Sequence, residues 1–225
     1  MTLRLSIALC LLLGALVLGW LRWRDVSPGR QAGQASAPTI IKKPVNFSYR
    51  PFDPANPPYD RPPTTPGEDA ACDSNFLSNA SVAGQTRQAD TTHATLVITQ
   101  VTVTLQLTIT IWVPLDVTQH VTDHEEGHRQ ISESYYQTAD KVAERIAASY
   151  IGKEVHTAGP DLDAESNKVL QQMADEITTE YNKELNPQPT QLLYDTITDH
   201  GRNGVVAKDA VAHALKNTAI ESTQP

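Results

Sequence analysis

Cysteine, aromatic residues and positive charge are all scarce in this chain of 225 residues. Its two cysteines, Cys10 and Cys72, do not form a disulfide framework, and we assign no role to Cys72. Aromatic residues make up 6% of the sequence, so the core must rest mainly on Val, Ile, Leu and Ala. A net charge of −8 leaves no basic surface for a nucleic-acid backbone. The composition therefore indicates one globular domain with extensions and no nucleic-acid partner.

The longest apolar run lies near the amino terminus, over residues 5–21, with Arg4 before it and Arg22 and Arg24 after it. This pattern is typical of a signal peptide or a signal anchor, which we assign to residues 1–24. No small-residue cleavage site follows at the usual distance, which favours an uncleaved anchor, whereas Arg22 and Arg24 would prefer the cytoplasm. We expect a periplasmic or extracellular protein, tethered to the inner membrane through residues 5–21 if the run is retained.

The next segment, residues 25–67, is rich in Pro, Gly, Ser, Gln and Ala, with prolines recurring every few residues from Pro51 to Pro66. Such a composition predicts a semi-rigid linker. A short strand over residues 45–49 could still belong to the folded part. We place the folded domain at residues 68–220.

Strict alternation of apolar and polar residues follows over residues 96–113. The side chains expected on the dry face are Val97, Val101, Val103, Leu105, Leu107, Ile109, Ile111 and Val113. A period of two predicts β-structure, and the lack of turn residues favours a single long strand bent by a bulge and ended by Pro114. Residues 72–92 show no such pattern and are expected to form a loop.

Helical periodicity dominates the rest of the chain. We expect one helix over residues 117–151, a second from about residue 161 to 185, and a last one over residues 205–218. Asn186 to Pro189 would end the second helix. The predicted fold is α+β, with a small antiparallel sheet packed on two long helices.

The first of these helices contains an HExxH motif, His124-Glu125-Glu126-Gly127-His128. Residues four apart stand on the same face of a helix, so His124 and His128 can direct two nitrogens at one cation. Glu125 is placed to take a proton from a metal-bound water. The apolar spacing puts both histidines on the inward face, which favours a zincin-like metal helix over a solvated charge run.

A catalytic zinc needs a third protein ligand from outside this motif. The residues alone leave His93, His120, His156, His200, His213 and several acids as candidates. Tyr194 could reach the site and stabilise an oxyanion, or it could simply pack against a helix.

The alternating strand, the HExxH helix and a later block, Tyr194 to Gly201, occur together in the order typical of one family. The combination resembles a bacterial domain family of unknown function that is predicted to contain secreted zinc-dependent proteases. The resemblance covers roughly residues 98–203. It implies that His124, His128 and His200 bind zinc and that Glu125 is the general base.

The sequence therefore predicts an exported zinc-dependent peptidase that acts on a peptide or protein substrate in the cell envelope. Two alternatives stay open. One is a non-catalytic envelope binding module whose metal is structural or absent, and the other is a metal-dependent amidase acting on cell-wall material.

Overall fold

The computed structural model describes residues 36–64 and 68–221. The predicted signal segment, residues 1–24, lies outside them. The strands are β1 (Thr39–Lys42), β2 (Asn46–Phe52), β3 (Ala71–Gln88), β4 (His93–Pro114) and β5 (Glu154–Ala158). The helices are α1 (Gln119–Ala148), α2 (Leu162–Glu184), α3 (Gln188–Thr198) and α4 (Ala207–Glu221).

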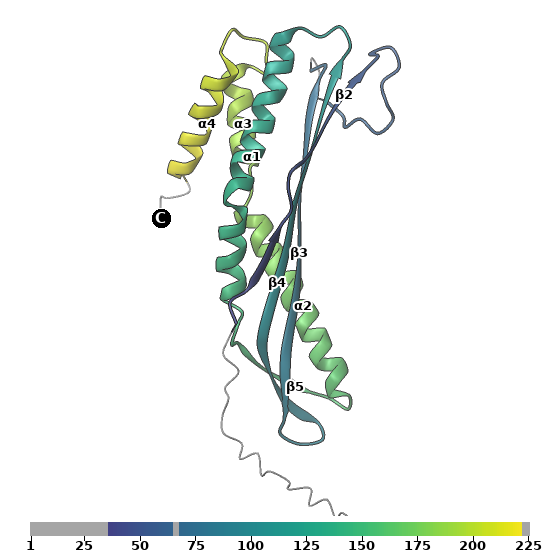
Figure 1. Ribbon diagram of the computed structural model, residues 1–225, viewed down its shortest axis with the longest axis vertical. Helices are drawn as coiled ribbons and strands as arrows, with labels where there is room; N and C mark the ends of the chain where they lie inside the picture. The colour runs from purple at the N-terminus through teal and green to yellow at the C-terminus, as the bar shows by residue number, and fades with distance from the viewer. Residues whose placement is uncertain (1–35, 65–67, 222–225) are drawn as a thin grey trace, which may run out of the picture. The chain divides into compact units, whose positions relative to one another are not determined.

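The sheet is mixed and is organised around β4. Its long antiparallel partner β3 runs along one edge, while β1, β2 and β5 share the other edge (Figure 1). The expectation of a mixed fold with a sheet and helices is confirmed. The expectation of an antiparallel sheet is wrong for β1 and β2, which run parallel to β4.

These two parallel strands lie inside the predicted linker, so the folded part begins well before residue 68. Pro44 separates them, because proline has no N–H to donate to a ladder. Pro51 is tolerated in β2, which is an edge strand among the described residues. The proline content that indicated a linker is therefore compatible with edge strands.

A bulge in β4 adjusts the phase of its apolar residues. Adjacent residues Ala83 and Gly84 of β3 pair with Gln100 and Ile98, which leaves Thr99 as the extra residue. The buried side chains accordingly fall on even positions before the bulge, such as Leu96 and Ile98, and on odd positions from Val101 onward. The predicted long, bulged strand is confirmed, but Val97 points away from the core face.

The strand β3 occupies residues 71–88, where a loop was expected. Its core face carries small or polar residues beside a few apolar ones, because the helices above supply polar partners. Ser74 accepts a hydrogen bond from Ser132 of α1, and Ser78 donates one to Asn182 of α2. The apolar alternation that identifies a half-buried strand is therefore weak in this stretch.

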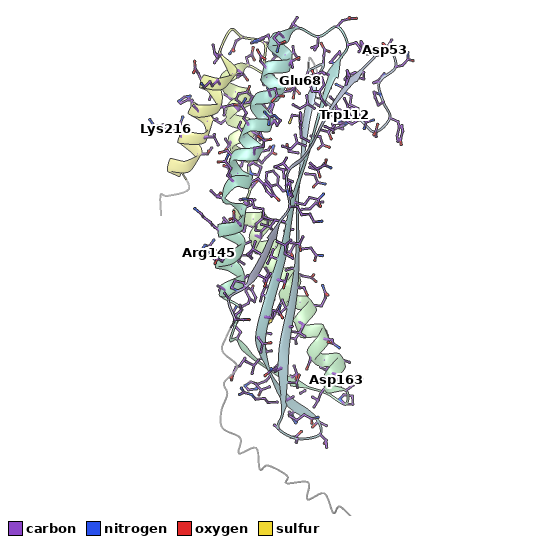
Figure 2. All side chains as sticks on the ribbon, viewed as in Figure 1. Asp53, Glu68, Trp112, Arg145, Asp163 and Lys216 are labelled. Atoms are coloured by element: carbon purple, nitrogen blue, oxygen red, sulfur yellow. The ribbon has the colours of Figure 1, made fainter. Side chains whose placement is uncertain are left out.

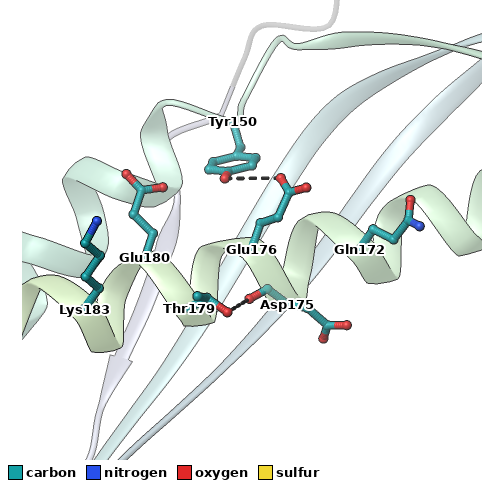
Figure 3. A pocket seen from close by; sticks show the side chains of 7 residues that line it. All are labelled: Tyr150, Gln172, Asp175, Glu176, Thr179, Glu180 and Lys183. Carbon is teal, nitrogen blue, oxygen red and sulfur yellow. Dashed lines mark hydrogen bonds between the residues drawn. The ribbon is translucent and has the colours of Figure 1, made fainter.

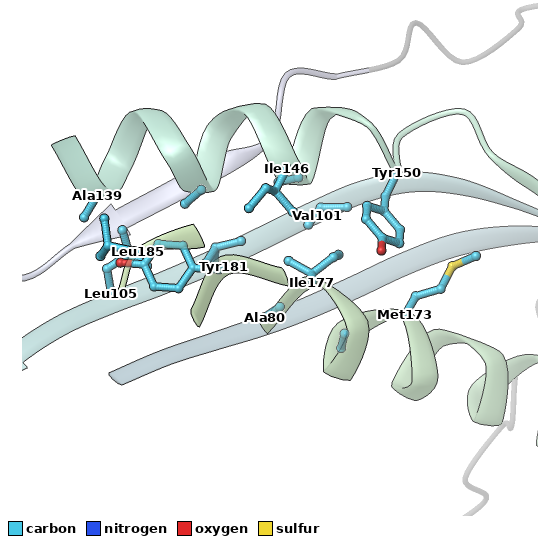
Figure 4. Packing of buried hydrophobic residues seen from close by; sticks show 14 of the residues in the cluster. Ala80, Val101, Leu105, Ala139, Ile146, Tyr150, Met173, Ile177, Tyr181 and Leu185 are labelled. Carbon is cyan, nitrogen blue, oxygen red and sulfur yellow. The ribbon is translucent and has the colours of Figure 1, made fainter. Parts of the chain in front are cut away.

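The main core lies between the sheet and the helices α1 and α2 (Figure 4). Its largest fully buried members are Tyr181, Leu96, Ile98, Leu105, Leu107, Ile109, Ile146, Ile177 and Val101. A second cluster joins α1 to α3 and α4 through Ile131, Tyr194, Ala210, Val211 and Ala214. The first half of α1 is thus held between the sheet and the two last helices (Figure 1).

Candidate metal site

The helix α1 brings the two histidines of the motif together. Pro114 ends β4, and Thr118 is the last residue with extended backbone before the helix starts. The Nε2 atoms of His124 and His128 are 3.2 Å apart. This separation places both nitrogens within reach of one cation, as the spacing predicts.

The third group at this point is the carboxylate of Asp195, which comes from α3. Its Oδ1 atom lies 2.9 Å from His128 Nε2 and 3.5 Å from His124 Nε2. One ligand atom from each of these three residues lies within 4.8 Å of the other two. Within residues 36–64 and 68–221, no other group of His, Cys, Asp and Glu meets this condition.

The donor set fits a divalent transition metal. Asp195 Oδ1 is buried and makes no hydrogen bond of good geometry with any described group, although it faces two imidazole nitrogens. Two imidazole nitrogens and a carboxylate oxygen form a ligand set that zinc accepts, with a fourth position left for water. A buried acceptor without a hydrogen bond is expected where a cation binds.

Electrostatics within the group keep the carboxylate charged. Burial alone would raise the pKa of Asp195, but the two imidazoles outweigh it and hold that pKa well below its usual range. Burial lowers the pKa of His124 and so favours its neutral form. Burial opposes protonation of His128 as well, but the nearby Asp195 carboxylate raises its pKa overall.

Each ring is oriented by a different neighbour. His128 Nδ1 is 2.6 Å from the Oε1 atom of Gln191. His124 has no hydrogen-bond partner at Nδ1 among the described groups, and its ring instead stacks on Tyr194 with centroids 5.1 Å apart. One histidine is therefore held by a hydrogen bond and the other by an aromatic face.

Tyr194 lies beneath the metal ligands. It is fully buried, and its hydroxyl donates a hydrogen bond to the backbone carbonyl of His124 at 3.1 Å. Gly127 makes this approach possible, because a Cβ at that position would lie 2.1 Å from the hydroxyl oxygen. Of the two roles left open for Tyr194 by the sequence, oxyanion stabilisation and packing, the full burial and the engaged hydroxyl favour packing.

Glu125 points from α1 toward the sheet. It is buried, its carboxyl is hydrogen-bonded by the backbone of Cys72 at the start of β3, and burial raises its pKa to about 7. A carboxyl with a pKa near neutrality can both accept and return a proton at physiological pH. Its place beside the two histidines in the motif suits the role of base.

His200, predicted as the third ligand, does not belong to the three-residue group. Its Nδ1 atom lies 2.5 Å from an oxygen of Glu68. Glu68 precedes β3 and lies near the start of α1 (Figure 2). The loop around it has left-handed backbone at Asp199, His200 and Gly201. A Cβ at Gly201 would lie 2.9 Å from the His124 ring, so the loop packs directly against a metal ligand.

Asp195 was not singled out from the several acids that the sequence left as candidates, because no helix was predicted over residues 188–198. As a helix, α3 directs Gln191, Tyr194, Asp195 and Thr198 to one face, at the spacing i, i+3, i+4, i+7. That inward polar stripe is the signal that could have identified the ligand.

Away from these residues, a groove lies between Tyr150, just after the end of α1, and α2 (Figure 3). Its lining residues are Tyr150, Gln172, Asp175, Glu176, Thr179, Glu180 and Lys183. Its lining includes no histidine or cysteine, and the Tyr150 hydroxyl donates a hydrogen bond to Glu176 at 3.5 Å. This groove therefore lacks the ligand set found on α1 and α3.

Comparisons of the chain with protein-family models, curated proteins and solved structures find no match. The family resemblance drawn from the motifs therefore stays a prediction. Among the described residues, no helix combines the length and apolarity needed to cross a membrane.

Proposed function

We propose that this protein is an exported zinc-dependent peptidase with a zincin-like HExxH helix, in which His124, His128 and Asp195 hold the ion. The observation that carries the proposal is the convergence of these three donor atoms from two helices, with a buried carboxylate oxygen left without a hydrogen bond. Glu125 directly follows the first ligand and is the carboxyl available for proton transfer.

Zinc in this position would polarise a carbonyl and lower the pKa of a bound water to about 7. With the ion bound, Glu125 would accept the proton of the attacking water and deliver it to the leaving amine. Tyr194 and Gln191 hold the two imidazoles in place.

The substrate we propose is an extended peptide that pairs with the outer edge of β3. The edges of β4 are not open in this way, because β3 occupies one side of it and β1, β2 and β5 occupy most of the other. Among the described residues, β3 pairs only with β4, so its outer edge is open. The hydrogen bond between Glu125 and Cys72 places the start of this edge beside the base.

The test is metal content and peptide hydrolysis of the purified full-length chain. We expect about one zinc per chain, and we expect Glu125→Gln to keep that zinc while hydrolysis of an unfolded protein substrate falls by roughly 10²–10⁴-fold. Glu126→Gln is the matched control, because this neighbouring acid pairs with Arg129 near the surface.

The outcomes separate the competing functions. Absence of any transition metal after zinc-supplemented expression would remove the enzyme proposal. Zinc without hydrolysis of peptides would favour the envelope binding module, and cleavage of cell-wall amides alone would favour the amidase. For export, a reporter fused after Gly67 should be active only outside the cytoplasm.

A further inference from the structure

Gln191 on α3 makes three hydrogen bonds to the helix that contains the HExxH motif. Its side-chain Nε2 donates to the backbone carbonyl of His128 at 3.1 Å and to the Ser132 hydroxyl at 3.0 Å. Its Oε1 lies 2.6 Å from His128 Nδ1. The amide therefore spans from α3 to both the backbone and the ring of one metal ligand.

These contacts determine which atom of the Gln191 amide is the oxygen and which is the nitrogen. A carbonyl oxygen can only accept, so the Gln191 atom facing the His128 carbonyl must be the NH₂ group. The Ser132 hydroxyl donates its own proton to Ser74 at 2.9 Å and is left to accept from the same NH₂ group. Both amide protons are then used, and the remaining atom, Oε1, must face the imidazole.

An amide oxygen has no proton to give, so the imidazole nitrogen facing it must carry one. His128 is thereby held with its proton on Nδ1, and in the neutral ring the lone pair lies on Nε2. Nε2 is the nitrogen that faces Asp195 and His124. A ring turned over, or protonated on Nε2, would have no lone pair to offer at the point where the three ligand atoms meet.

We infer that Gln191 is a positioning residue that fixes the Nδ1–H tautomer of His128 and so presents its Nε2 lone pair to the metal. The inference rests on the proposed metal site but adds a residue that neither the motif nor the resemblance assigns. His124 has no equivalent partner among the described groups, so this single amide supplies the hydrogen-bonded orientation of the pair. It also ties metal binding to the docking of α3 on α1.

The first test reads the tautomer in metal-free protein. In the full chain labelled with ¹⁵N-histidine, long-range proton–nitrogen spectra are recorded as the pH is raised until the His128 ring is neutral. The remaining ring proton should then be on Nδ1. Gln191→Met, which removes the hydrogen bonds but keeps the length of the side chain, should shift the ring toward the Nε2–H form. Gln191→Glu keeps an acceptor and should preserve the Nδ1–H form.

The second test measures zinc affinity by competition with a chromophoric chelator. Gln191→Met should weaken binding by roughly 10–100-fold, as expected for loss of a group that orients a ligand histidine. Gln188→Leu, at an exposed position on the same helix, should leave both the affinity and the tautomer unchanged.

An unchanged tautomer in Gln191→Met would overturn the inference, even if affinity fell, because the effect would then be one of packing alone. If the wild-type chain bound no metal, the proposed function would fail while the tautomer measurement would still decide the role of Gln191. The two failures are therefore distinguishable.

Discussion

The two halves of α1 bury different kinds of side chain. The first half buries His124, Glu125 and Ser132, whereas the second half buries Ala139, Ala143 and Ile146. Burying polar and ionisable groups costs free energy unless they are paired, while burying aliphatic groups against a sheet stabilises the fold. The comparison teaches that one helix has two roles: its first half carries the site and also packs Ile131 against α3 and α4, while its second half belongs to the main core.

The largest expected effect concerns the third ligand. Asp195→Ala should lower zinc affinity by more than the roughly 10–100-fold typical of a group outside the ligand set, because it removes a charged donor atom. His200→Ala should cost less, because His200 is paired with Glu68 instead of joining the three donor atoms. Competition titration of both variants measures the difference, and a larger loss for His200→Ala would return the third ligand to the residue predicted from the sequence.

That comparison shows what the sequence could and could not predict about the site. The spacing of His124 and His128 was sufficient because both lie on one helix, where geometry follows from sequence separation. Asp195 lies on another helix, and which of several nearby groups turns inward depends on how α3 docks on α1. Tertiary packing, and not local spacing, decides between Asp195 and His200.

Substitutions in the second half of α1 should change the stability of the fold and not its metal binding. Ile146→Ala removes a fully buried side chain from the main core and should lower the free energy of unfolding by about 2–5 kcal/mol. Urea denaturation of the metal-free chain measures this. Val206→Ala, at an exposed position, should change it by less than about 0.5 kcal/mol. A large loss of zinc affinity in the folded fraction of Ile146→Ala would show that the two halves are not separable.

The fold was predictable where one pattern dominated. Helices α1, α2 and α4 and the strand β4 follow apolar periodicity, so their positions agree with the sequence to within a few residues. β3 was missed because Ser74 and Ser78 bind polar partners on the helices and replace apolar residues on the core face. The proline-rich composition led to a linker prediction that missed β1, whereas the short strand allowed over residues 45–49 corresponds to β2. Edge positions tolerate proline, so such a composition is compatible with both strands.

A smaller effect is expected where α1 and α3 touch at the site, between Gly127 and Tyr194. Gly127→Ala would place a Cβ 2.1 Å from the Tyr194 hydroxyl, so Tyr194 or α3 must move. Overpacking of this kind should cost about 1–3 kcal/mol of stability, with a parallel loss of zinc affinity because Tyr194 stacks on His124. Gly204→Ala is the control, since a Cβ there meets no atom within 4 Å. Equal thermal stability of the two variants would contradict the packing shown for Tyr194.

The smallest effect is a chemical one and concerns Cys72, which lies where the site half of α1 meets the start of β3. Burial raises the pKa of its thiol from about 9 to about 12, and the nearby Glu125 and Glu126 carboxylates add to the shift. Because the folded-state pKa is the higher one, the protonated thiol contributes stability below about pH 9, and this contribution is lost as the pH rises toward 12.

Only the thiolate reacts with iodoacetamide, so labelling of Cys72 at about pH 8.5 should be roughly a thousandfold slower in folded protein than in urea. Peptide mapping distinguishes Cys72 from Cys10, and Leu77→Ala, at an exposed position on the same strand, should leave the rate unchanged. Rapid labelling of Cys72 in the folded chain would mean that the junction between β3 and the first half of α1 opens to solvent. The first half of α1 would then be less firmly packed on the sheet than the second half.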